Sequence, residues 1–110
     1  MRRLAAPLLA LALLVPAALA RGEEMPVFRV EMKDGTIAPT RLEVPAHTAF
    51  KLEIHNLGET PVEFESLKLK KEKVLAPKST GSLVFRRVAP GEYDFFDDFH
   101  PDARAVLVAK

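Results

Sequence analysis

Short runs in which apolar and polar residues alternate make up most of the chain. Phe28, Val30 and Met32 alternate with charged residues, and the alternation is clearest over residues 50–55. This period of two residues is typical of half-buried β-strands. Further runs of the same kind cover residues 41–44, 62–65, 83–88, 92–96 and 105–109. About seven short strands, separated by Pro and Gly turns and with almost no helical period, predict an all-β fold, a β-sandwich with Greek-key connections.

Residues 67–75 do not follow this pattern clearly. Leu67, Leu69 and Val74 are interspersed with four lysines, which are Lys68, Lys70, Lys71 and Lys73. The segment fits either a basic edge strand or a single helical turn. Lysines on an edge strand prevent it from pairing with other chains, but the same cluster could instead bind an acidic partner.

The first twenty residues have the pattern of a secretory signal peptide. Arg2 and Arg3 precede an apolar run over residues 4–19, and residues 18–20 read Ala-Leu-Ala, as small residues do at cleavage sites. A membrane anchor is the alternative, but the run is shorter than the roughly 20 residues that cross a bilayer, and Pro7 and Pro16 interrupt it. We therefore expect export with cleavage after residue 20, a flexible leader over residues 21–25, one domain over residues 26–110, and no membrane insertion after cleavage.

Charge and cysteine content narrow the possible functions. The chain has 16 Lys and Arg against 15 Asp and Glu, and removing Arg2 and Arg3 with the signal peptide changes its net charge from +1 to −1. This balance gives no reason to expect nucleic-acid binding. The chain contains no Cys, which excludes disulfides and thiolate chemistry. Apolar packing, with or without a bound ion, must therefore hold the small domain together.

Two groups of side chains are candidates for chemistry. Four potential metal or proton ligands follow one another between the last two strand patterns, namely Asp97, Asp98, His100 and Asp102. Glu63 and Glu65 lie two residues apart and therefore share one face of a strand. The simpler alternatives are that the two glutamates form a solvated face paired with nearby lysines, and that residues 97–98 only initiate a turn.

Three segments together resemble a known family. Residues 42–50 (LEVPAHTAF), 56–64 (NLGETPVEF) and 90–100 (PGEYDFFDDFH) are similar to the V-x-A-G-x-x-V, N-x-x-x-x-P-H and P-G-x-Y-x-F-x-C-x-x-H segments of cupredoxins. Within that family the chain resembles the EfeO type, a bacterial iron-uptake branch, which carries T-P-x-E-F-E-S and F-x-x-F-H-P. The resemblance implies a cupredoxin-like fold, a periplasmic location and a role in iron uptake beside an inner-membrane iron permease.

The chain departs from the blue-copper pattern at three of four ligand positions. Glu63 follows the loop Pro and Val62 in place of the first His, Asp97 stands in place of Cys, and the axial Met falls near Ala103. Only His100 matches. A blue-copper electron-transfer centre requires the Cys sulfur, so the resemblance implies a protein that does not carry out this electron transfer.

The topology of cupredoxins would bring both acidic groups to one end of the sandwich. We therefore predict that Glu63, Glu65, Asp97 and His100 bind a transition metal, copper or iron, and that Asp98 and Asp102 orient the His. The alternative function is a metal-free docking module that binds a protein through the basic edge at residues 68–73. No Ser–His–Asp arrangement, phosphate loop or cofactor fingerprint is recognisable, so we do not expect an enzyme.

Overall fold

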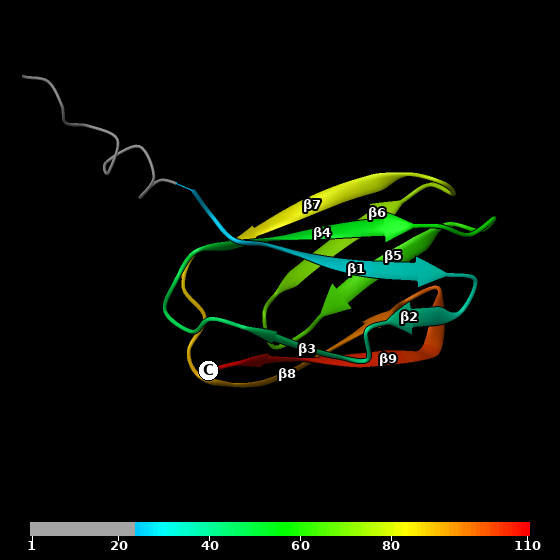
Figure 1. Cartoon of the computed structure of the whole chain (residues 1–110). Helices are drawn as coiled ribbons and strands as arrows, with labels where there is room; N and C mark the ends of the chain where they lie inside the picture. Colours follow the sequence, from blue (N-terminus) through cyan, green and yellow to red (C-terminus); the bar gives the residue numbers. More distant parts are fainter. Residues whose placement is uncertain (1–23) are drawn as a thin grey trace, which may run out of the picture.

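The computed structural model describes residues 24–110, which form nine β-strands in two sheets packed face to face (Figure 1). The strands are β1 (Val27–Lys33), β2 (Thr36–Ala38), β3 (Arg41–Val44), β4 (Phe50–Asn56), β5 (Val62–Ser66), β6 (Lys71–Leu75), β7 (Thr80–Phe85), β8 (Gly91–Asp97) and β9 (His100–Ala109). The predicted signal peptide and residues 21–23 of the predicted leader lie outside the described residues. No helix within residues 24–110 is long and apolar enough to cross a membrane.

The all-β sandwich prediction is confirmed, with nine strands in place of about seven. One sheet has the order β2-β1-β4-β7 and the other β3-β9-β8-β5-β6. The pairs β1–β4 and β3–β9 are parallel, and the remaining pairs are antiparallel. Two parallel strands that are neighbours in a sheet cannot be joined by a tight turn and need a longer crossover connection. Strands that are distant in sequence are therefore neighbours in each sheet.

Apolar and polar residues alternate along each strand, and the apolar side chains form the core between the two sheets. In β4, Phe50, Leu52 and Ile54 are buried, and the residues between them are only partly buried. The rings of Phe64 in β5 and Phe95 in β8 stack with centroids 5.0 Å apart. These side chains belong to one continuous apolar cluster, which supplies the main stabilisation of a domain without disulfides.

The ambiguous segment is a turn followed by the edge strand β6, which confirms the edge-strand interpretation. Lys71 Nζ donates to the Val84 carbonyl at 3.2 Å, and Lys68 Nζ donates to the Glu92 carbonyl at 2.9 Å. Side chains at the exposed positions of β6 belong to Glu72 and Val74 instead. Part of the lysine cluster therefore makes contacts within the domain.

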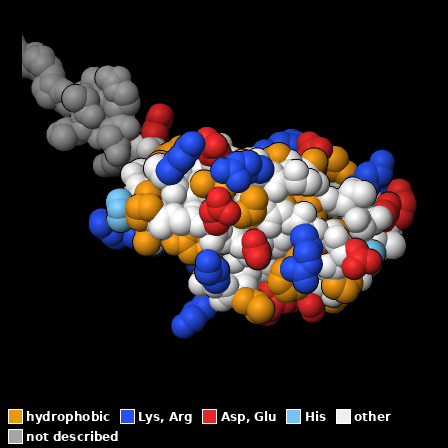
Figure 2. Space-filling model, turned by 90° about the horizontal axis from the view of Figure 1, so that it is seen from below, with side chains coloured by type: hydrophobic (Ala, Val, Ile, Leu, Met, Phe, Trp, Pro, Cys, Tyr) orange, Lys and Arg blue, Asp and Glu red, His pale blue; other side chains and the backbone are white. Residues whose placement is uncertain are grey.

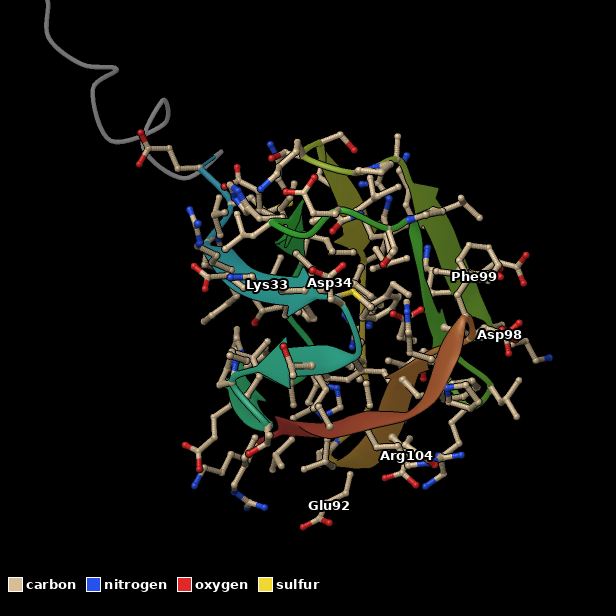
Figure 3. All side chains as sticks on the ribbon, turned by 90° about the vertical axis from the view of Figure 1, so that its right-hand side faces the viewer. Lys33, Asp34, Glu92, Asp98, Phe99 and Arg104 are labelled. Carbon is tan, nitrogen blue, oxygen red and sulfur yellow. The ribbon has the colours of Figure 1, made fainter. Side chains whose placement is uncertain are left out.

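Three turns meet at the end of the sandwich that faces the viewer in Figure 3. Asp34, in the turn between β1 and β2, accepts hydrogen bonds from the Glu59 and Thr60 amides at 3.0 and 3.1 Å. If residue 35 had a Cβ atom, that atom would lie 3.7 Å from Cδ2 of His100, so Gly35 in the β1–β2 turn is close to the His100 ring. The loops after β1, β4 and β8 are therefore held at one end, as the cupredoxin resemblance implied.

Candidate metal centre

Asp97, the last residue of β8, is buried and bonded through both carboxylate oxygens. Its Oδ1 accepts hydrogen bonds from the backbone amides of Glu63 and Phe99, each at 3.0 Å. Its Oδ2 lies 2.8 Å from Nδ1 of His100. Asp97 therefore joins β5, the β8–β9 turn and the first residue of β9, and these contacts use the oxygens that the sequence predicted for a metal.

The contact with Asp97 orients His100. The His100 tautomer that donates to a carboxylate at this contact carries its proton on Nδ1 and leaves Nε2 for another partner. The His100 side chain is 30% exposed, so the ring is not fully enclosed by the domain. Carboxylate–imidazole pairs of this kind orient histidines that bind metals. The prediction that Asp98 and Asp102 orient His100 is wrong, since Asp97 makes this contact.

Glu63 and Glu65 meet a third carboxylate that the sequence did not identify. Glu72 of β6 is the register partner of Glu65, and ligand oxygens of Glu63, Glu65 and Glu72 all lie within 4.8 Å of one another. We call these three residues the carboxylate triad. Glu72 was missed because it lies in the ambiguous segment, where no pattern gave its register with β5.

The triad has no basic partner among residues 24–110, because none of the ion pairs found there involves its members. The solvated face paired with lysines is therefore not seen. Burial raises the pKa of Glu63 above its usual value, and repulsion from Glu72 and Asp98 raises it further. Burial also raises the pKa of Glu65, with Asp98 and Glu72 adding to the shift. A cation would offset this repulsion.

The four predicted ligands lie in two groups. Among the described residues, the group within 4.8 Å contains Glu63 and Glu65 but neither Asp97 nor His100. The register pairs Asp97 with Phe64, which is buried, whereas Glu63 and Glu65 lie on the opposite face of β5. The signal for this separation was present in the sequence, because Asp97 follows two residues after the buried Phe95.

The raised pKa values predict how pH affects stability. Protonation of Glu63 and Glu65 is easier in the folded state than in the unfolded state, so the metal-free protein should lose stability as the pH rises from the unfolded to the folded pKa values. The Glu65→Gln variant should therefore melt at a higher temperature than the unmodified protein at pH 7, and the difference should shrink at pH 4.

Thermal denaturation at the two pH values, in the presence of a chelator, checks this prediction. Glu43→Gln is the control, because Glu43 is exposed and pairs with Lys110 at 3.3 Å, so this change should not stabilise the protein. A lower melting temperature for Glu65→Gln at pH 7 would contradict the prediction.

The residues present do not fit a blue-copper centre. Asp97 stands where such a centre needs a Cys thiolate, and its two oxygens already accept hydrogen bonds from within the domain. The position matched to the axial Met is near the buried Ala103, which has no ligand atom in its side chain. Any metal would be held by carboxylates and imidazole, a harder set of donors.

Comparison with known proteins agrees with the architecture. The model of the family described as "Cupredoxin-like domain" matches residues 4–109. An uncharacterized protein of Rickettsia prowazekii (strain Madrid E) is 38% identical over 74 residues, which is 67% of this chain. The match spans 59% of that relative's length.

Solved structures with the same fold share little sequence with the chain. Auracyanin B has a TM-score of 0.67 at 18% identity, over 80% of this chain and 92% of that one. A purple cupredoxin from Nitrosopumilus maritimus has a TM-score of 0.56 at 15% identity, over 74% and 98% of the two chains. The metal-binding domain of the Cu(I)-exporting P-type ATPase CopA of Streptococcus pneumoniae has a TM-score of 0.64 at 9% identity, over 76% and 84%. With the family match over nearly its whole length, the chain belongs to the cupredoxin-like domain family.

Proposed function

We propose that this protein is an exported member of its family that binds a transition metal, iron or copper, through carboxylate and imidazole ligands and serves periplasmic iron uptake. The observation that carries the metal-binding part is the carboxylate triad, whose three acidic side chains lie together without a basic partner among residues 24–110. Carboxylate oxygens favour iron, and copper has the higher intrinsic affinity for most donor sets.

His100 is a second candidate donor outside the triad. Its ring is hydrogen-bonded to Asp97, its side chain is partly exposed, and it lies at the same end of the sandwich as the loops after β4 and β8. Imidazole is a good ligand for both copper and iron. We propose that the triad holds the ion, and that the His100 imidazole, which Asp97 positions, is a separate donor outside the triad.

The iron-uptake part rests on the EfeO-type resemblance. The T-P-x-E-F-E-S segment that carries it supplies Glu63 and Glu65, which are two of the three triad members. An inner-membrane iron permease is the proposed partner. The docking-module alternative has less support, because the ammonium groups of Lys68 and Lys71 donate to backbone carbonyls within the domain.

Calorimetric titration of the metal-stripped protein with Cu(II), and with Fe(II) under anaerobic conditions, tests the metal-binding proposal. We expect one saturable site that the Glu63→Gln/Glu65→Gln variant loses. His100→Asn should bind this ion about as tightly as the unmodified protein, because His100 lies outside the triad. Because removal of the two charges relieves repulsion, the double variant should remain folded, so loss of binding would not reflect unfolding.

Glu43→Gln is again the matched control, since it removes one exposed carboxylate of the same sheet outside the triad. Absence of saturable binding in the unmodified protein would contradict the proposed function. Binding that survives in the double variant but not in His100→Asn would place the ion away from the triad.

A further inference from the structure

A shallow hollow lies on the outer face of the sheet β3-β9-β8-β5-β6. It is lined by Leu67 and Lys68 from the turn before β6, Asp94 and Phe96 from β8, and Arg104 from β9. Figure 2 shows the side of the molecule formed by β3, β9 and β8, where basic, acidic and hydrophobic side chains lie close together. The hollow therefore combines both signs of charge with an apolar surface.

Arg104 is the best-prepared binding group of the hollow. Its guanidinium lies 4.9 Å from the centroid of the Phe96 ring, its register partner across β8 and β9. Within residues 24–110 this guanidinium makes none of the ion pairs or side-chain hydrogen bonds found. A cation–π contact restrains the guanidinium without using its N–H donors. A guanidinium with free donors matches a planar carboxylate, which it binds through two parallel hydrogen bonds.

Lys68 places a second positive charge at the hollow. Its ammonium donates to the Glu92 carbonyl at 2.9 Å and lies 5.4 Å from the centroid of the Tyr93 ring. These contacts hold the ammonium in place, and an ammonium has three donors, so two remain for a ligand. The two cations favour an anionic ligand.

The other lining residues narrow its chemistry. Leu67 and Phe96 offer apolar contact to a carbon skeleton, which an inorganic anion such as phosphate does not use. The Asp94 carboxylate repels an anion whose polar atoms are all hydrogen-bond acceptors. It can, however, accept a hydrogen bond from a hydroxyl group of the ligand. An organic acid with a carboxylate, a hydroxyl group and a carbon skeleton offers a matching contact to the cations, to Asp94 and to the apolar residues of the hollow.

The hollow adjoins the carboxylate triad. Glu65 of the triad and Phe96 of the hollow are register partners on neighbouring strands, so their backbones are adjacent. We propose that the hollow binds one carboxylate of a small hydroxycarboxylic acid, and that the protein takes up its metal as the chelate of that acid. This inference rests on the proposed function for the metal, whereas binding of the free acid does not require it.

Titration with citrate in the absence of metal tests the hollow. We expect saturable binding that Arg104→Gln weakens roughly tenfold or more, since a hydrogen-bonded charged pair is lost. Arg104→Lys should also bind more weakly, because it keeps the charge but not the planar fork. Tricarballylate, which has three carboxylates and no hydroxyl, should bind more weakly than citrate, and Asp94→Asn should reduce this preference.

Arg41→Gln is the control, because Arg41 is an exposed Arg of the same sheet outside the hollow. Citrate affinity that is equal in Arg104→Gln and the unmodified protein would overturn the proposal, as would absence of citrate binding. Equal affinities for citrate and tricarballylate would overturn the requirement for a hydroxyl group.

Two further titrations separate this inference from the proposed function. Arg104→Gln should leave the affinity for Cu(II) alone unchanged, and Glu63→Gln/Glu65→Gln should leave citrate binding unchanged. Citrate binding without Cu(II) or Fe(II) binding would contradict the metal function and support the hollow. Metal binding without citrate binding that depends on Arg104 would support the metal function and overturn this inference.

Discussion

The Phe64→Ala variant is expected to lose about 3–5 kcal/mol of unfolding free energy, because a fully buried ring is removed from the centre of the sandwich. Phe64 stacks on Phe95 with ring centroids 5.0 Å apart. The residues on either side of it, Glu63 and Glu65, are two members of the triad and lie on the opposite face of β5. Urea denaturation followed by circular dichroism measures the loss. The variant should also bind metal more weakly wherever a measurable fraction of it is unfolded.

Val74→Ala provides the comparison for that experiment. Val74 lies on the neighbouring strand β6 and is 58% exposed, so truncation of its side chain should change the unfolding free energy by no more than about 0.5 kcal/mol. Equal losses for Phe64→Ala and Val74→Ala would show that the ring of Phe64 is not part of the core.

The second large effect is expected for Asp97→Ala. This change removes the buried acceptor of two backbone amides and of His100 Nδ1, and partly buried donors left without partners destabilise the fold. We expect a loss of about 2–4 kcal/mol in unfolding free energy. Nitrogen chemical shifts of the His100 ring should show that Nδ1 no longer dominates as the protonated position.

Asp98→Ala is the matched control, because Asp98 is adjacent to Asp97, carries the same charge and is exposed. Its unfolding free energy should change by less than about 0.5 kcal/mol. The loss of unfolding free energy in Asp97→Asn should lie between those of Asp97→Ala and Asp98→Ala, because the amide oxygen can still accept hydrogen bonds from the backbone amides. A His100 tautomer unaffected by Asp97→Ala would contradict the positioning role, even if the variant were destabilised.

The strands were predictable because alternation is a local property of a sequence. Residues 28–32 and 50–54 reveal their inward faces without knowledge of any partner strand. The Asp34–Gly35 turn and the hairpin of β8 and β9 were likewise readable from turn residues between apolar runs. By contrast, β2 has only three residues, which is too short for a recognisable period.

The candidate centre was only partly predictable. The sequence by itself determined the alternating strands of a sandwich, the absence of a thiolate, and the presence of Glu63, Glu65, Asp97 and His100 near two of its loops. Only the tertiary structure decided that Glu72 completes the triad and that the Asp97 carboxylate contacts His100. The physical reason is that a strand's inward face depends on its own residues, whereas side chains meet across strands according to register, which pairing between distant segments sets.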